Sequence, residues 1–441
     1  MTSPIRTWWL LLFIKMVLAA SLPLSNDEAY YWVWSHHLQL SYFDHPFMVA
    51  LLFKMGHIFE NFFHAARWPA VILSHLSLIL WIDLLKPYMS NKQLNFWLIL
   101  ITLTPFTGIG SIIVTPDLPL TIFWTLGIWL THKAFSQPKN LYFACLGLII
   151  GLGFSAKYHM ALFVPFTMVA LFFTKKLHTL SLQRVFLGVF FFLLGASPVF
   201  IWNYLNDFIS FKFQLNHGLG QTSWTPMWTF TYIVGQLCLL FPTTFMLTYK
   251  RKDHNFTLTL LYFLGWLPLF FFLLTSFKGH VEANWPIIAY LPLLSLAVIN
   301  NPNLKLLKIN IVFFALLNIY AISDSLLAWT PQKLRITKLH EYKQFSDIEK
   351  LYTQYKPLYA HSFQMASQLS YRLREPIYKL HGVNRKDFYD FREESIPQTF
   401  RYFVVVVKGE SLPTWAQKNK HTIIARHAVN NKYEILEVHR P

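Results

Sequence analysis

The residues best suited to chemistry are acids and a histidine that follow the first apolar run of the chain. Asp27 and Glu28 come directly after this run, and Asp44 and His45 lie in the segment Tyr42–Pro46. A carboxylate can take a proton from an acceptor hydroxyl or amine, acting as a general base. Asp27 could equally cap a helix, because Asn and Asp are favourable at helix starts. The position directly after a membrane-length apolar run indicates chemistry at a membrane face.

Three later connections between apolar runs carry further ionisable or polar residues. These residues are Asp117 in the first, Lys157 and Tyr158 in the second, and Lys278, His280, Glu282 and Asn284 in the third. Asp117 could simply favour a helix start, whereas a cation such as Lys157 between apolar helices calls for an anionic partner or ligand. Fixed cations can stabilise a departing phosphate as it gains charge. The set therefore predicts group transfer from a membrane-borne phosphate donor.

The sequence has no Walker motif and no dinucleotide glycine fingerprint, so a nucleotide site is not expected. A divalent metal stays an open alternative, with no cofactor assigned. The available ligands are His36, His37, His45, Asp44, Glu28 and Glu282, yet no strict spacing such as His-Glu-x-x-His occurs. No metal ligand is therefore assigned.

The composition defines the elements that must position these groups. Of the 441 residues, 54% are hydrophobic and only 13% are charged, whereas soluble chains carry about a quarter charged residues. This indicates a polytopic all-α membrane protein with about eleven transmembrane helices. The candidate spans are 8–24, 66–85, 94–113, 118–134, 141–156, 160–174, 185–203, 228–248, 256–275, 286–300 and 309–328. Lys15 interrupts the first run, where we expect it to snorkel or to meet an acid.

The charges of the loops predict the orientation of the chain. If the N-terminus is cytoplasmic, 13 Lys and Arg fall in cytoplasmic loops, as the positive-inside bias requires. An odd number of spans then places the acidic segments and the C-terminus on the extracytoplasmic side of the membrane. Topology and anionic lipids also explain the net charge of +17 without nucleic acid. We interpret 35–65 as interfacial amphipathic helices, and Tyr30, Tyr31, Trp32 and Trp34 mainly as interfacial anchors.

A second domain is predicted after the membrane part. Residues 329–441 hold 19 of the 38 Lys and Arg, and residues 1–328 hold the other 19. Strands are expected at 357–360, 376–378 and 400–408, a helix at 363–373, and a closing hairpin of 422–428 with 433–438. The predicted organisation is a transmembrane domain over 1–328 and a small periplasmic α/β domain over 329–441.

Several blocks of this sequence resemble a known family. They are Asp27–Trp32, Tyr42–Pro46, Thr115–Asp117, Ser155–Tyr158, Pro198–Asn203 and Glu282–Pro286. Together they are similar to the signature blocks of bacterial integral-membrane glycosyltransferases of the GT-C class, related to protein O-mannosyltransferases and the lipid A aminoarabinose transferase. The resemblance extends over about residues 10–300. One departure is Phe47, which follows Pro46 where the family commonly has a second proline.

The resemblance implies a polyprenyl-phosphate-linked sugar as donor and an inverting attack by an acceptor hydroxyl. It implies Asp27 as the base, Glu28 as an orienting or acceptor-contacting group and Asp117 as a second essential acid. Lys157, Tyr158, Lys278 and His280 would contact the donor phosphate, and Asp44, His45, Glu282 and Asn284 would contact substrate. The expected acceptor is lipid A, lipopolysaccharide or another envelope glycolipid, and a protein is the alternative within the class.

Two other kinds of protein fit parts of the pattern. A transporter or flippase for lipid-linked sugars would also have many spans, but carriers tend to place their site at the membrane midplane. Here the polar groups collect at one face. A scaffold protein with a receptor-like tail leaves the loop acids and Lys157 unexplained. The identity of the sugar does not follow from the sequence.

Overall fold

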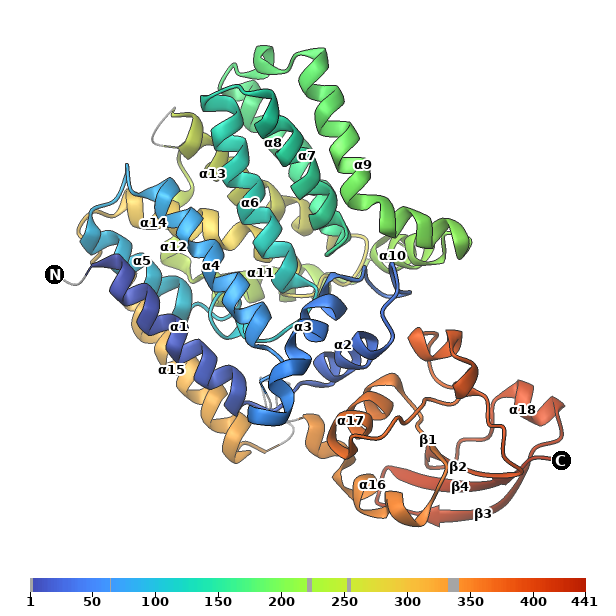
Figure 1. Ribbon diagram of the computed structural model, residues 1–441. Coiled ribbons are helices and arrows are strands. Elements are labelled where there is room, and N and C mark those ends of the chain that lie inside the picture. Colours follow the sequence, from blue (N-terminus) through green and yellow to red (C-terminus); the bar gives the residue numbers. More distant parts are fainter. Residues whose placement is uncertain (1–2, 64, 220–223, 252–254, 332–340) are drawn as a thin grey trace. The chain divides into compact units, whose positions relative to one another are not determined.

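The computed structural model describes residues 3–63, 65–219, 224–251, 255–331 and 341–441, and it comprises two compact units (Figure 1). The first unit contains Met1–Ser21 and Gln39–Ser323, and the second contains Leu22–Leu38 and Asp324–Pro441. The change of unit at Ser323 lies close to the expected domain boundary after residue 328. The segment 22–38, which carries Asp27 and Glu28, packs within the second unit against Asp324–Pro441, the part called the C-terminal unit below. The sequence did not suggest this packing.

The first unit is helical. Its helices are α1 (Pro4–Ser21), α3 (Met48–Phe63), α4 (Trp68–Leu85), α5 (Asn91–Leu103), α6 (Asp117–Ser136), α7 (Asn140–Phe154), α8 (Phe163–Phe173), α9 (Leu182–Leu205), α10 (Ile209–Leu219), α11 (Pro226–Leu240), α12 (Pro242–Thr248), α13 (Phe256–Thr275), α14 (Tyr290–Asn300) and α15 (Leu307–Leu327). Among the described helices, α1, α4, α9, α13 and α15 are long and apolar enough to cross a membrane, and the bent pair α11 and α12 would add a sixth. Eleven spans therefore stay a prediction.

Two of the expected spans are interrupted by proline. The run 94–113 is not one helix, because α5 ends at Leu103 and Thr104 adopts an extended conformation before Pro105. A residue before proline is disfavoured in the helical region. The run 228–248 bends by 85° between α11 and α12, where Phe241 has a φ of 64° and Pro242 follows.

Small residues bring α7 and α9 into close contact. A Cβ atom on Gly147 would lie 2.1 Å from the carbonyl oxygen of Gly188, and one on Gly151 would lie 2.3 Å from that of Phe192. Such close approach between backbones is typical of membrane helices, because lipid supplies no hydrophobic drive for their association. This contact fixes the end of α7, where Lys157 follows.

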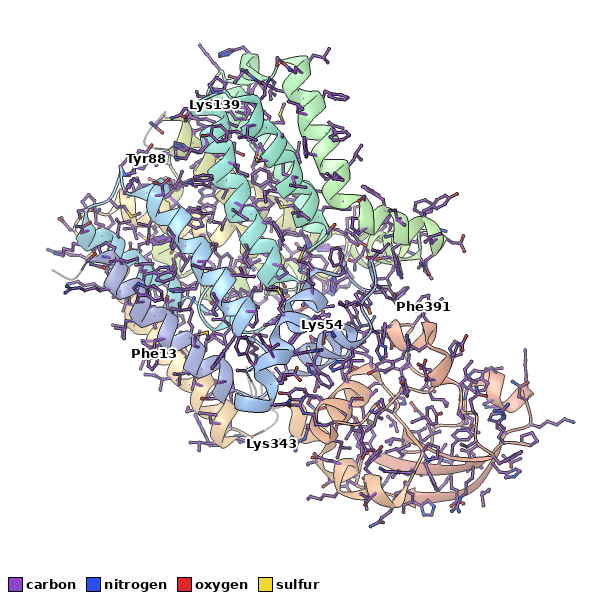
Figure 2. The ribbon with its side chains drawn as sticks, viewed as in Figure 1. Phe13, Lys54, Tyr88, Lys139, Lys343 and Phe391 are labelled. Atoms are coloured by element: carbon purple, nitrogen blue, oxygen red, sulfur yellow. The ribbon has the colours of Figure 1, made fainter. Side chains whose placement is uncertain are left out.

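The outer faces of these helices suit lipid. On α1, Trp9 and Phe13 are exposed apolar side chains, and Figure 2 shows Phe13 at the rim of the first unit. The interval 35–65 contains α3, which exposes Met55 and Ile58 while it buries Val49 and Phe53. This two-sided character agrees with the expected amphipathic helix, and its place at the membrane interface stays a prediction.

The second unit contains a four-stranded sheet. Its strands are β1 (Leu358–Tyr359), β2 (Arg401–Val407), β3 (Thr422–Ala428) and β4 (Tyr433–His439), in the order β1-β2-β4-β3. β1 and β2 are parallel and are joined through α17 (Phe363–Leu373), whereas β4 pairs antiparallel with both of its neighbours. Shorter helices are α16 (Ser346–Leu351) and α18 (Thr414–Lys418), with a 3-10 turn η8 (Phe388–Phe391). The expected α/β domain is therefore present.

One expected strand, 376–378, is wrong. The chain is irregular there and makes a single bridge between Ala360 and Lys379. Pro376 begins this segment, and proline has no N–H to donate to a strand partner.

The aromatic residues after the first apolar run are part of a protein core. They lie in α2 (Asn26–His36), and Tyr30 is only 2% exposed. The Tyr30 ring centroid lies 4.4 Å from that of Phe363 in α17, and the Trp32 centroid lies 5.2 Å from that of Tyr371. The interpretation of these residues as membrane-interface anchors is therefore wrong, because α17 and η8 cover them.

Candidate active site

A buried polar cluster in the first unit joins three of the connections singled out by the sequence. The Nζ atom of Lys157 donates a hydrogen bond to Oδ1 of Asp117 over 2.7 Å. The Nδ2 atom of Asn284 donates to Oδ2 of the same carboxylate over 2.6 Å. Asp117 is 7% exposed and Lys157 is 5% exposed. The structure thus brings together residues that are 40 and 167 positions apart in the chain.

Local structure explains the position of each member. Asp117 is the first residue of α6 and follows Pro116, so its negative charge lies at the positive end of the helix dipole. Lys157 follows the end of α7, and its backbone N–H still donates to the carbonyl of Gly153 over 3.0 Å. The hydroxyl of Ser155 ties the same turn to α9 by donating to the carbonyl of Gly195 over 2.9 Å.

Asp117 and Lys157 differ in how fully they are hydrogen-bonded. Both oxygens of Asp117 accept a hydrogen bond, one from the ammonium group and one from the amide. Lys157 has three N–H donors, and its one hydrogen-bond partner among the described residues is Asp117. Asp117 is therefore held as an orienting group, while Lys157 keeps two donors for an anionic group.

Tyr158, Asp44 and His45 lie in the same unit. The Tyr158 hydroxyl is 2.9 Å from the hydroxyl of Ser210 in α10. The backbone carbonyl of Asp44 accepts a hydrogen bond of 2.5 Å from Gln214, also in α10. His45 and Lys157 are both electrostatic neighbours of His159. These contacts place the segment 42–46 and the Lys157 loop on a common support, α10.

The third connection reaches the cluster through Asn284 alone among its described residues. Lys278, His280 and Glu282 are exposed. His280 Nδ1 lies 3.6 Å from Glu282 Oε1, and both side chains are about half exposed at 55%. Such a pair contributes little to stability. The donor-phosphate role predicted for Lys278 and His280, and the substrate role of Glu282, stay predictions.

The acidic pair Asp27 and Glu28 lies in the second unit. Ser25 is the N-cap of α2, and its hydroxyl accepts the Glu28 N–H over 3.3 Å. The Glu28 carboxylate in turn accepts the Ser25 N–H over 3.0 Å, which completes a capping box. Glu28 is fully buried, whereas Asp27 in the same turn is exposed. The N-cap is thus Ser25 and not Asn26 or Asp27. The Glu28 carboxylate stabilises the start of the helix through this capping box.

No metal centre is apparent in the described part of the chain. No three side chains of His, Cys, Asp or Glu come together there as a group that could hold an ion. The candidate ligands His36, His37, His45, Asp44, Glu28 and Glu282 therefore do not form such a set within the described residues.

The sequence did not reveal the partner of Lys15. Its ammonium group is buried and donates to the hydroxyl of Ser111 over 2.8 Å, so it neither snorkels nor meets an acid. It lines a cavity of about 30 Å³ together with Ser77 and Thr121, which is large enough for a water molecule or two. In the sequence, the one sign of this buried site was a lysine inside an apolar run.

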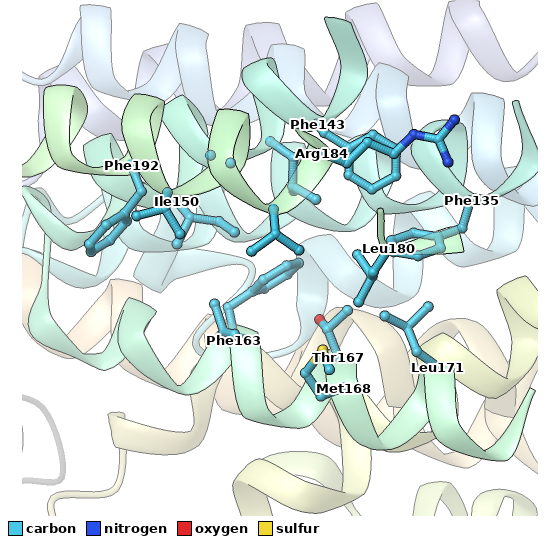
Figure 3. A pocket seen from close by; sticks show the side chains of 16 residues that line it. Phe135, Phe143, Ile150, Phe163, Thr167, Met168, Leu171, Leu180, Arg184 and Phe192 are labelled. Carbon is cyan, nitrogen blue, oxygen red and sulfur yellow. The ribbon is translucent and has the colours of Figure 1, made fainter. Parts of the chain in front are cut away.

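An apolar groove lies beside the two helices that the Lys157 loop connects. Its volume is about 280 Å³, and it is lined by residues of α7, α8 and α9 together with Phe135 of α6 and Leu180 (Figure 3). Ile150 of α7 and Phe163 of α8 line it nearest in sequence to Lys157, and Arg184 lines it near the start of α9. Its lining side chains are almost all apolar.

Comparison with known proteins shows which proteins this chain resembles. A family model described as dolichyl-phosphate-mannose-protein mannosyltransferase matches residues 44–202, which include Asp117 and Lys157. The fold matches the crystal structure of ArnT from Cupriavidus metallidurans bound to undecaprenyl phosphate, with a TM-score of 0.68 over 98% of this chain and 97% of that chain. The chain is similar to the GT-C membrane glycosyltransferases, in sequence over residues 44–202 and in fold. The predicted resemblance is thereby confirmed.

Two further matches refine the comparison. The apo structure of the same ArnT also has a TM-score of 0.68, and with 12% sequence identity these two matches show the fold. The lipid A galacturonosyltransferase RgtD of Rhizobium johnstonii is 25% identical over 186 residues. That alignment spans 41% of this chain and 38% of RgtD, so the likeness covers less than half of either protein.

Proposed function

We propose that this GT-C relative transfers a sugar from a polyprenyl-phosphate donor to a glycolipid acceptor outside the cytoplasm. The observation that carries the proposal is the buried Lys157, which is oriented by Asp117 and retains two donors. A buried cation with unused donors suits a phosphate that gains charge as it leaves. Support also comes from ArnT, whose structure contains undecaprenyl phosphate, and from RgtD, which is described as acting on lipid A.

In the proposed reaction, an acceptor oxygen attacks the anomeric carbon of the sugar from the face opposite the phosphate. The new bond joins the acceptor oxygen to that carbon, and the bond from the carbon to the phosphate oxygen breaks. Asp27 takes the proton of the acceptor hydroxyl, and Lys157 stabilises the leaving polyprenyl phosphate. The anomeric configuration is inverted. The exposure of Asp27 in the first turn of α2 is compatible with access by an acceptor.

We further propose that the hydrocarbon tail of the donor lies in the apolar groove. α7 and α8, which line this groove, are the helices joined by the loop that contains Lys157. A donor whose phosphate binds beside Lys157 would therefore have an apolar surface nearby for its lipid tail. Lipid A or a related envelope glycolipid is the proposed acceptor, with a protein as the alternative suggested by the family model. The N-terminus is proposed to be cytoplasmic, with the C-terminal unit in the periplasm.

The function is tested with purified protein and a donor whose sugar is radiolabelled. We expect covalent transfer of label to a lipid A acceptor, and loss of at least about a hundredfold in rate for Asp27→Asn, the range of general-base effects. Asp347→Asn is the matched control, because this acid of α16 lies in the same unit and half of its side chain is exposed. Equal rates for Asp27→Asn and the wild type would refute the base assignment.

A carrier is the competing function favoured by a specific observation, the 85° bend between α11 and α12. Broken helices are common in transporters. Uptake of the labelled lipid into vesicles without any covalent transfer would support the carrier and refute the transferase.

A further inference from the structure

We propose that the C-terminal unit positions the acidic helix α2, with Gln368 and the backbone of Phe388 as the positioning groups. This inference rests on the proposed role of Asp27 in sugar transfer. It assigns a role to the C-terminal unit. Neither the family model over residues 44–202 nor the sequence of the sheet gives this unit a role.

The first attachment precedes Asp27. Gln368 lies in α17, is 1% exposed, and donates a hydrogen bond from Nε2 to the carbonyl of Leu24 over 2.9 Å. Leu24 directly precedes Ser25, the N-cap of α2. A buried carbonyl that loses such a partner carries a substantial desolvation cost. One amide of the C-terminal unit therefore determines where the chain enters α2.

The second attachment follows Asp27 by one helical turn. The Tyr30 hydroxyl accepts the backbone N–H of Phe388 over 2.9 Å. Phe388 is the first residue of η8, so this hydrogen bond ties the start of that turn to α2. The Tyr30 ring also packs against Phe363, with 4.4 Å between centroids.

The turn η8 is itself held rigidly. Asp387 and Asp390 form a capping box around it. The ammonium group of Lys379 lies 2.8 Å from Asp387 and 2.6 Å from Asp390, and its side chain is entirely buried. Buried ion pairs of this kind tolerate little displacement, because separation leaves an uncompensated charge. Phe388 is therefore a fixed reference point for Tyr30.

Asp27 lies between these two attachments and is exposed, while Glu28 and Ala29 beside it are fully buried. A carboxylate that acts as a base must be held within about 0.5 Å of its productive position. The attachments at Leu24 and Tyr30 restrict the first turn of α2 on both sides of Asp27. Loss of either attachment should therefore lower the rate of the chemical step more than the affinity for the donor.

The test uses the full-length protein in detergent and two variants, Gln368→Leu and Tyr30→Phe. Gln417→Leu is the control, because Gln417 Nε2 donates to the carbonyl of Leu412 within the same unit and away from α2. For both test variants we expect kcat to fall about tenfold while the donor KM changes less than about twofold. Amide exchange of Glu28 and Ala29 should rise about tenfold. The control should change neither quantity.

Each outcome bears on the inference. Unchanged exchange at Glu28 and Ala29 in both variants would overturn it, as would an equal loss of kcat in Gln417→Leu. Tyr30→Phe keeps the ring in its core, so it decides the question if Gln368→Leu does not fold. If the wild type transfers no sugar, the proposed function fails, and the exchange measurement alone decides whether the C-terminal unit orders α2.

Discussion

Replacement of Lys157 by methionine tests the central ion pair, because it removes the charge and keeps an apolar side chain of similar length. At a separation of 2.7 Å and an effective dielectric constant of about 20, the attraction to Asp117 is about 6 kcal/mol. Burial of both groups offsets much of this attraction. The loss of Lys157 alone leaves a buried carboxylate with only the Asn284 amide, which should cost about 3–5 kcal/mol of unfolding free energy.

The double variant Asp117→Asn with Lys157→Met separates stability from function. It contains no buried charge at this site, and an asparagine at position 117 can still accept the Asn284 amide. We therefore expect the double variant to recover at least about 2 kcal/mol relative to Lys157→Met alone. Binding of polyprenyl phosphate should remain lost, because the buried cation proposed to bind the phosphate is absent.

The assay is denaturant unfolding in detergent micelles for the wild type, both single variants and the double variant, combined with titration of undecaprenyl phosphate. A coupling energy under about 0.5 kcal/mol would refute the claim that the two side chains form one buried unit. A double variant that binds the lipid as the wild type does would refute the phosphate role of Lys157.

Three further predictions concern other parts of the chain. Gly188→Leu should fill the apolar groove and weaken binding of undecaprenyl phosphate about tenfold, because a Cβ at Gly188 would meet only the Phe143 carbonyl oxygen, at 3.8 Å. Gly235→Leu is the control, because a Cβ there would meet nothing within 4 Å and Gly235 does not line the groove. Equal binding by both variants would exclude the groove. Gly151→Leu should cost at least about 3 kcal/mol or prevent folding, measured by thermal unfolding, because its Cβ would lie 2.3 Å from the Phe192 carbonyl oxygen. Burial lowers the pKa of His421 below its ordinary 6.5. The stabilisation from burying the neutral imidazole is therefore present above pH 6.5 and is lost as the pH falls. His421→Phe should flatten the decrease in unfolding free energy between pH 7 and 5, and an unchanged slope would contradict this.

Local patterns in the sequence predicted local structure well. The helix 363–373 and the hairpin of 422–428 with 433–438 match α17, β3 and β4 closely, because their periodicity and turn residues are short-range signals. The need of Lys157 for an anionic partner was also predicted, since an intramembrane cation is costly on its own. Asp117 proved to be that partner, and it is a helix start as well.

Apart from segments that proline interrupts, the errors arose where distant segments meet. Tyr30 and Trp34 fit the pattern of interfacial anchors, but their partner Phe388 lies 358 residues after Tyr30. Aromatic residues after an apolar helix look the same whether lipid head groups or another domain covers them. The contact of Asn284 with Asp117 was hidden for the same reason, because it spans 167 residues.

The discontinuous second unit has a consequence for how the protein is made. α2 leaves the ribosome early, but the helix that covers it ends at Leu373, after every helix of the first unit has been synthesised. Chains fold from the N-terminus during synthesis. The side chains of α2 therefore lack their packing partners until the last part of the chain emerges. A chain that is cut short before Gln368 has Asp27 but lacks the amide that holds the entry of its helix. The order of synthesis therefore delays the assembly of the acidic helix until the membrane helices are already in place.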